Sequence, residues 1–154
     1  MTMPPNHGDF NRGVELFNRA HFFDAHEVLE DVWRSLPRDR PTRRHLQGMV
    51  QLAVAFHHES TGNHVGARSV LERAMCNLNG ADRSFPDLDL DRLRTELELW
   101  RRYLDDSESA GAKKDGKKID GKKKDGKKID GKKLDGRDVR RHNAPALPKI
   151  MLRR

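Results

Sequence analysis

The sequence predicts an all-α fold, a compact bundle of about five helices. Apolar residues recur three and four positions apart along most of residues 10–106, which is the spacing of one face of a helix. No segment shows the alternation of apolar and polar residues that marks a half-buried strand. Glycine, proline and asparagine interrupt the helical pattern and divide it into separate helices. Two stacked tetratricopeptide-like hairpins plus a C-terminal helix are one arrangement that fits.

Two helices are expected in the first third of the chain. Residues 1–9 are predicted to form a flexible N-terminus, because prolines and a glycine oppose regular structure there. Asp9 can cap a helix over about residues 10–20, and a second helix follows over about residues 24–36. The apolar positions of the second helix share one face: Ala25, Val28, Leu29, Val32 and Leu36.

Three more helices follow. A third is expected over about residues 43–61, and its middle, GMVQLAVAF, is apolar nearly all round, as in a helix packed on several sides. Gly62 offers a left-handed stop and Asn63 a new cap, so a fourth helix should run to about Leu78. Asp89 opens a fifth helix. Its apolar residues recur at helical spacing: Leu90, Leu93, Leu97, Trp100 and Leu104.

A faint internal repeat accompanies this pattern. AHEVLEDVW from Ala25 aligns with ARSVLERAM from Ala67 at a shift of 42 residues, and each segment is the second helix of a short-looped pair. Two stacked hairpins would produce such a repeat. Any amphipathic helix also reuses Ala, Val, Leu and Glu at these offsets, so the sequence leaves both explanations open.

The composition changes near Ser107, which places a domain boundary there. Residues 1–106 carry 14 Arg, no Lys and 17 acids, a net charge of −3. Residues 107–154 carry 12 Lys and 5 Arg against 7 acids, a net charge of +10. We therefore assign the helical domain to residues 10–106 and a disordered Lys-rich tail to residues 107–154.

The tail is a low-complexity repeat. Five pentads of the DGKKI type begin at Asp115, and one apolar residue per pentad cannot form a core. Paired lysines within residues 113–141 could contact the phosphates of nucleic acid without sequence specificity, since no aromatic residue follows Tyr103 to stack on bases. An inert, soluble tail is the alternative.

The rest of the composition limits the class of protein. One cysteine, Cys76, rules out an internal disulfide and suits a reducing compartment. No apolar run approaches the length of a membrane span. A cytoplasmic location without a membrane partner is therefore expected, and a protein partner or a homo-oligomer is left open.

One stripe of the second helix carries polar groups where a core face is expected. His26, Glu30 and Trp33 lie at positions i, i+4 and i+7, which form one line on a helix. The third helix offers a matching row: Gln47, Gln51 and His58. If the two rows face each other, imidazole, carboxylate and amide groups converge at the interface between the helices.

At these positions the sequence resembles a known family. AHEVLEDVW matches an aHe-xLE-xxW helix, and LQGMVQLAVAFHHESTGNHVGA matches lQG-xIQ-xA-xxxxH-xxxGN-xxGA, two motifs of the bacterial domain-of-unknown-function family numbered 309. The resemblance covers about residues 10–78. It implies a compact helical bundle and a histidine–glutamate cluster that could hold a metal, but no established reaction. The polar motif positions are His26, Glu27, Glu30, Trp33, Gln47, Gln51 and His58.

Three functions are open for this cluster. In a structural network, Glu30 would accept a hydrogen bond from an imidazole and Gln51 would bridge between these groups. Trp33 would donate a hydrogen bond from its indole N–H. In a small-ligand or protein-binding module, the same groups would line a pocket. In a hydrolase-like enzyme, His26, Glu30 and His58 would hold a divalent metal. We expect a structural or binding module, with the metal-dependent enzyme as the alternative.

Overall fold

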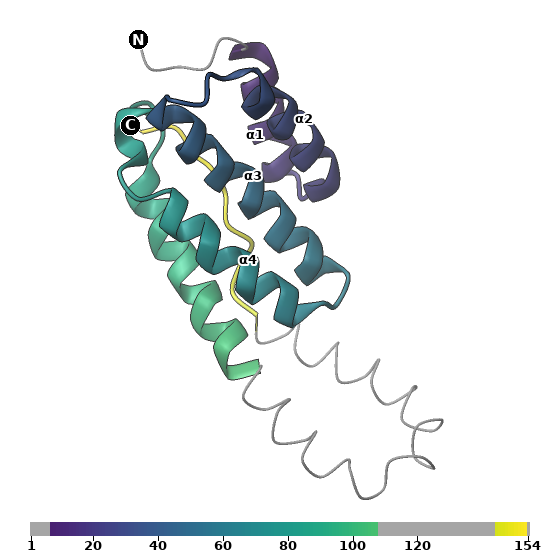
Figure 1. Cartoon of the computed structure of the whole chain (residues 1–154). Helices are drawn as coiled ribbons and strands as arrows, with labels where there is room; N and C mark the ends of the chain where they lie inside the picture. Colours follow the sequence, from purple (N-terminus) through teal and green to yellow (C-terminus); the bar gives the residue numbers. More distant parts are fainter. Residues whose placement is uncertain (1–6, 108–143, 154) are drawn as a thin grey trace, which may run out of the picture.

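The computed structural model describes residues 7–107 and 144–153 of the chain (Figure 1). Within these ranges the regular secondary structure is helical, apart from one isolated antiparallel bridge between Leu88 and Leu152. The prediction of an all-α bundle is confirmed. No helix of the described ranges is both long and apolar enough to cross a membrane.

The first helical hairpin consists of α1 and α2. α1 covers His7–Asn18, so it begins inside the segment predicted to be flexible. α2 covers Phe22–Ser35, and its buried face is the one predicted from its periodicity. In the turn between them Ala20 adopts a left-handed conformation with a φ of 66°.

The second helical hairpin consists of α3, Pro41–Ser60, and α4, His64–Asn77. Gly62 in the loop between them is left-handed, with a φ of 85°. The side chain of Asn63 caps α4, because its Oδ1 accepts from the Gly66 N–H at 2.9 Å. The roles predicted for the glycine and the asparagine are confirmed.

The two hairpins share one register at the shift of 42 residues. α1 ends at Asn18 and α3 ends at Ser60, while α2 and α4 are both 14 residues long. The left-handed residue has the same place in each loop, Ala20 in the first and Gly62 in the second. The internal repeat in the sequence therefore corresponds to two helical hairpins with matching loops.

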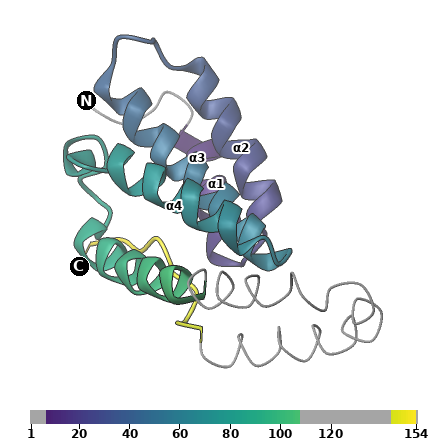
Figure 2. The ribbon, with the colours of Figure 1, turned by 60° about the horizontal axis from the view of Figure 1, so that its bottom comes forward.

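After α4, a short 3₁₀ helix, η1 (Ala81–Arg83), leads into a helix over residues 90–107 that lies beside α4 (Figures 1 and 2). Asp89 caps this helix, since its Oδ1 accepts from the Arg92 N–H at 3.1 Å. The face predicted from its spacing is buried: Leu90, Leu93, Leu97, Trp100 and Leu104.

The core lies between the helices, and aromatic rings link its parts. α2 packs against α1 and α3, and α3 packs against α4. The ring of Phe56 on α3 lies 6.0 Å from that of Phe17 on α1 and 5.2 Å from that of Trp100, centroid to centroid. The nearly all-round burial predicted for α3 is confirmed by its buried residues: His45, Leu46, Gly48, Met49, Val50, Leu52, Ala53, Ala55 and Phe56.

Residues 144–153, which we call the strap, run as an extended segment beside α1 and the helix of residues 90–107 (yellow in Figures 1 and 2). Ile150 of the strap is only 3% exposed. The prediction that disorder extends to the end of the tail is therefore wrong for these ten residues. Pro145 and Pro148 explain the extended form, because proline cannot join a helix interior and restricts the residue before it.

The remaining tail predictions concern residues outside the described ranges. The pentad repeat and the phosphate contacts expected within residues 113–141 lie there, and so do residues 1–6 of the predicted N-terminus. These predictions stay predictions.

Candidate functional site

The polar row of α2 is present as predicted and is held within that helix. His26 Nε2 lies 3.0 Å from Glu30 Oε2, and His26 Nδ1 lies 3.4 Å from Glu27 Oε1. The second oxygen of Glu30 pairs with Arg34 one turn further on. The side chains of His26 and Glu30 are 24% and 28% exposed, so the pair lies at the edge of the core and solvent reaches it.

The polar row of α3 turns toward α4. Gln51 Oε1 accepts from Asn77 Nδ2 of α4 at 2.7 Å. Gly48 lies against the same helix, where an added Cβ would come within 2.8 Å of Leu78 Cγ. Gln47, four residues before Gln51, is half-buried. The amide group of Gln51 is therefore a partner of α4.

His58 lies next to the loop between α3 and α4. Its Nδ1 lies 3.3 Å from Asn63 Nδ2, in the loop that leads to α4. The histidine of α3 that approaches α2 is His57, whose ring centroid lies 5.6 Å from that of Phe23. Adjacent residues of a helix point about 100° apart, so His57 can approach α2 where His58 was predicted to do so. The predicted convergence of the two rows is wrong.

Trp33 packs against the start of α3 without the hydrogen bond that we predicted. The guanidinium of Arg43 lies 4.2 Å from the centroid of the Trp33 ring and also donates to the Leu36 carbonyl at 3.2 Å. The indole Nε1 is buried, and no group in the described part of the chain accepts its hydrogen. Trp33 and Arg43 thus join α2 to α3 by a cation–π contact.

The metal site predicted from His26, Glu30 and His58 is not formed. Within residues 7–107 and 144–153, no three His, Cys, Asp or Glu side chains are grouped so that they could hold a metal ion. The physical reason is the rotation of α3, which pairs His58 with Asn63 instead of directing it toward His26.

A surface centred on Phe23 replaces the predicted cluster. Phe23 is 55% exposed, and its ring centroid lies 6.2 Å from that of His26 and 5.6 Å from that of His57. Glu27 and Glu30 flank it on α2. We call these five residues the Phe23 surface. Periodicity could have identified it, since Phe22 continues the buried face of α2 and its neighbour must then point outward.

A buried polar network that the sequence did not indicate joins α3 to the segment after η1. His45 Nδ1 lies 2.6 Å from Ser84 Oγ, which lies 3.2 Å from Thr42 Oγ1. Burial, and secondly the charge of Arg44, lower the pKa of His45. His45 and Ser84 are both buried, so this pair fastens the segment to α3 and does not present a hydroxyl to a substrate.

Comparison with known proteins finds similarity to a family and to two proteins. Residues 10–70 match the model of a family described as "Domain of unknown function (DUF309)". The chain is similar to "Uncharacterized protein YpuF" of Bacillus subtilis (strain 168), 33% identical over 101 residues that make up 66% of this chain and 57% of that protein. It is also similar to an "Uncharacterized protein" of Aquifex aeolicus (strain VF5), 28% identical over 82 residues, 53% of this chain and 24% of that protein.

The match therefore spans just over half of the first relative and about a quarter of the second. The family motifs lie on α2, α3 and the start of α4, which carry both the Phe23 surface and the contacts between α3 and α4. Over residues 10–70 the chain is therefore similar to the family described as a domain of unknown function, DUF309.

Proposed function

We propose that this protein is a helical binding module and that the Phe23 surface holds a cationic segment of a partner protein. The observation that carries the proposal is the exposure of Phe23, at 55%, beside two imidazole rings. Aromatic side chains are enriched in protein interfaces because they bury a large area and lose few rotamers on binding. An exposed ring with polar neighbours suits such a role.

The charge around Phe23 selects the kind of partner. Asp24 and Glu27 are exposed on the first turns of α2, and Glu30 follows one turn later. Arg34 lies in the last turn, where it pairs with Glu30 and Asp31. The half of α2 that carries the aromatic ring is therefore acidic. A lysine or arginine could contact the ring face and a carboxylate at the same time.

Some groups of the predicted site take new roles in this proposal. His26, together with His57, lies beside the Phe23 ring, and Glu27 and Glu30 supply the negative charge. Trp33, through its contact with Arg43, supports the position of α2 against α3.

The test is a titration of the ¹⁵N-labelled full chain with a synthetic ten-residue peptide of lysine and leucine. We expect amide shifts around Phe23 and His57, and weaker binding as salt is raised. Phe23→Ala should reduce the affinity at least about fivefold, as for a residue that contributes about 1 kcal/mol or more to binding. Leu99→Ala is the matched control, since Leu99 is 51% exposed on another helix.

Three outcomes would reject the proposal. Shifts that map to other helices, or an affinity that Phe23→Ala leaves unchanged, would show that this surface does not bind the peptide. Binding seen only after residues 108–143 are replaced by an uncharged linker of equal length would identify the chain's own lysines as the occupant instead of a partner.

A further inference from the structure

The strap is held mainly through its backbone, in the way that a protein holds a peptide ligand. The side-chain amide of Asn18 forms two hydrogen bonds with one residue: Nδ2 donates to the Ile150 carbonyl at 2.9 Å, and Oδ1 accepts from the Ile150 N–H at 2.7 Å. Trp100 Nε1 donates to the Ala146 carbonyl at 2.9 Å. These contacts do not depend on which side chains the strap carries.

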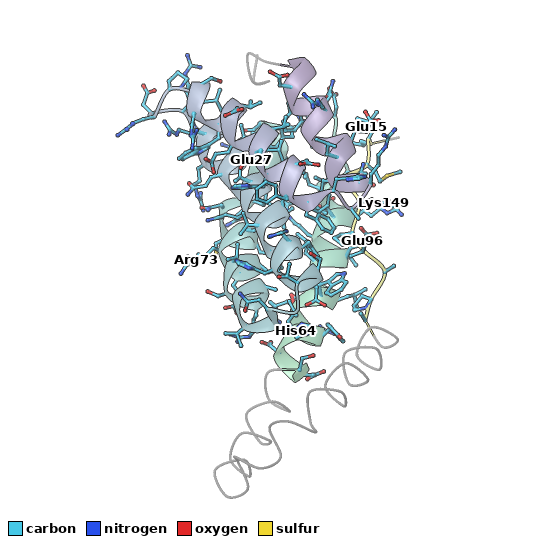
Figure 3. The ribbon with its side chains drawn as sticks, turned by 90° about the vertical axis from the view of Figure 1, so that its right-hand side faces the viewer. Glu15, Glu27, His64, Arg73, Glu96 and Lys149 are labelled. Carbon is cyan, nitrogen blue, oxygen red and sulfur yellow. The ribbon has the colours of Figure 1, made fainter. Side chains whose placement is uncertain are left out.

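Further backbone contacts continue along the strap. The Lys149 N–H donates to Glu96 Oε1 at 3.2 Å, and Figure 3 shows the two residues together at one edge of the molecule. The Asp89 N–H donates to the Met151 carbonyl at 2.8 Å. The Leu88–Leu152 bridge lies at the end of this series. The helix of residues 90–107 and its cap thus contact the strap from Ala146 to Met151.

The spacing of these contacts shows that the strap is fully extended. From Ala146 to Met151 it advances five residues, about 16–17 Å at the rise of an extended chain. Its partners, Trp100 and Asp89, are eleven residues apart, about 16–17 Å at the rise of a helix. The two lengths agree, and the order of the contacts shows that strap and helix run antiparallel.

Only two strap side chains are buried. Pro148 and Ile150 point inward, whereas Leu147 is 44% exposed and Leu152 is 70% exposed. Ile150 belongs to the buried hydrophobic core, whose other residues lie within residues 10–104. The surface therefore selects a proline or other small apolar residue followed two positions later by an aliphatic one, and it accepts varied residues elsewhere.

We propose that Asn18, Glu96, Trp100 and the backbone of Asp89 form a binding site for extended peptide segments, which residues 144–153 fill in this structure. The strap is tied to the helix of residues 90–107 through 36 residues, 108–143. A tether of this kind raises the local concentration of the strap, so a free peptide competes poorly with it. The site is distinct from the Phe23 surface: Figure 3 shows Glu27 away from the edge that carries Lys149 and Glu96.

The test removes the tether but keeps every residue of the site. A specific protease sequence is placed within residues 108–143 of the full chain, and the purified protein is cleaved there. A fluorescent peptide with the sequence APALPKIMLR, residues 144–153, is then added and followed by anisotropy, while mass spectrometry detects release of the original strap fragment. We expect binding to the cleaved protein, release of the fragment, and much weaker binding to the uncut chain.

Matched variants test the mode of binding. The Ile150→Asp peptide should bind at least about tenfold more weakly, because a buried aliphatic side chain is lost. The Leu147→Asp peptide, with the same change of charge at an exposed position, should bind within about twofold of the original. Asn18→Asp in the protein keeps the acceptor for the Ile150 N–H but loses the donor to its carbonyl, and should also weaken binding.

The opposite results overturn the proposal. If the original fragment stays with the body and does not exchange, or if its release abolishes the helical circular dichroism signal, the strap is a fixed part of the fold. If the Ile150→Asp peptide binds as well as the Leu147→Asp peptide, the contact is not made at the site described.

Discussion

The left-handed residues of the two hairpin loops allow a reciprocal test of the structure. Ala20 has a φ of 66° and is exposed, whereas Gly62 has a φ of 85° at the equivalent place 42 residues later. A left-handed conformation strains any residue with a Cβ but not glycine. We therefore expect Ala20→Gly to stabilise the protein and Gly62→Ala to destabilise it.

The magnitude follows from two opposing effects. Left-handed strain in an alanine amounts to about 1–2 kcal/mol. Glycine makes the unfolded chain more flexible, which offsets about 0.4–1 kcal/mol of the gain. The net change is about 0.5–1 kcal/mol in each direction. In a domain of this size it shifts the melting temperature by about 2–8 °C.

Urea denaturation followed by circular dichroism at 222 nm would measure both variants and their combination. The slope of the free energy of unfolding with urea should stay constant, because neither change alters the surface exposed on unfolding. The double variant should lie close to the original protein. If Ala20→Gly lowers the free energy of unfolding while Gly62→Ala also lowers it, Ala20 is not left-handed and the matching of the two loops is refuted.

Three further predictions concern stability. Gly48→Ala should destabilise by about 1–3 kcal/mol in thermal melts, because its Cβ would lie 2.8 Å from Leu78 Cγ; an unchanged melt would mean that α3 and α4 are further apart. Asn63→Ala should cost about 1 kcal/mol through loss of the cap of α4, and urea denaturation at neutral pH would detect it. The lowered pKa of His45 should give stability that is complete above about pH 6.5 and declines as the pH falls from there toward the folded-state pKa. His45→Gln should flatten that decline in urea midpoints measured from pH 7.5 to 5.5, and an equally steep decline would assign it to other groups.

The helices could be predicted because their signals are local. The cap at Asp89 and the spacing of the leucines after it define the fifth helix without knowledge of its neighbours. The same holds for Gly62 and Asn63, whose backbone roles depend on adjacent residues alone. These elements agree with the structure to within a few residues at each end.

The site could be predicted only in part, because the side of a helix that faces its neighbour depends on contacts between residues far apart in the sequence. The contact between His26 and Glu30 follows from their spacing within one helix. Whether α3 directs His57 or His58 toward α2 depends on its rotation, which Gly48 and Gln51 fix through contacts with α4. Single-helix periodicity contains no information on that choice.

The strap had neither a periodic pattern of its own nor a partner nearby in the sequence. An extended segment has no helical period, and its partner Asn18 is 132 residues away from Ile150 in sequence. The change from lysine-rich pentads to APALPKIML, with two prolines and several apolar residues, was the one feature that could have indicated it.

This separation in sequence has a consequence during protein synthesis. A ribosome adds about 5–20 residues per second, so Ile150 is made about 2–9 s after Ser107, 43 positions earlier in the chain. Helical hairpins form in far less time, so every helix can fold while the indole of Trp100 and the amide of Asn18 still face water. For those seconds the edge of the bundle that carries Asn18 and Trp100 lacks the segment that covers it in the finished protein.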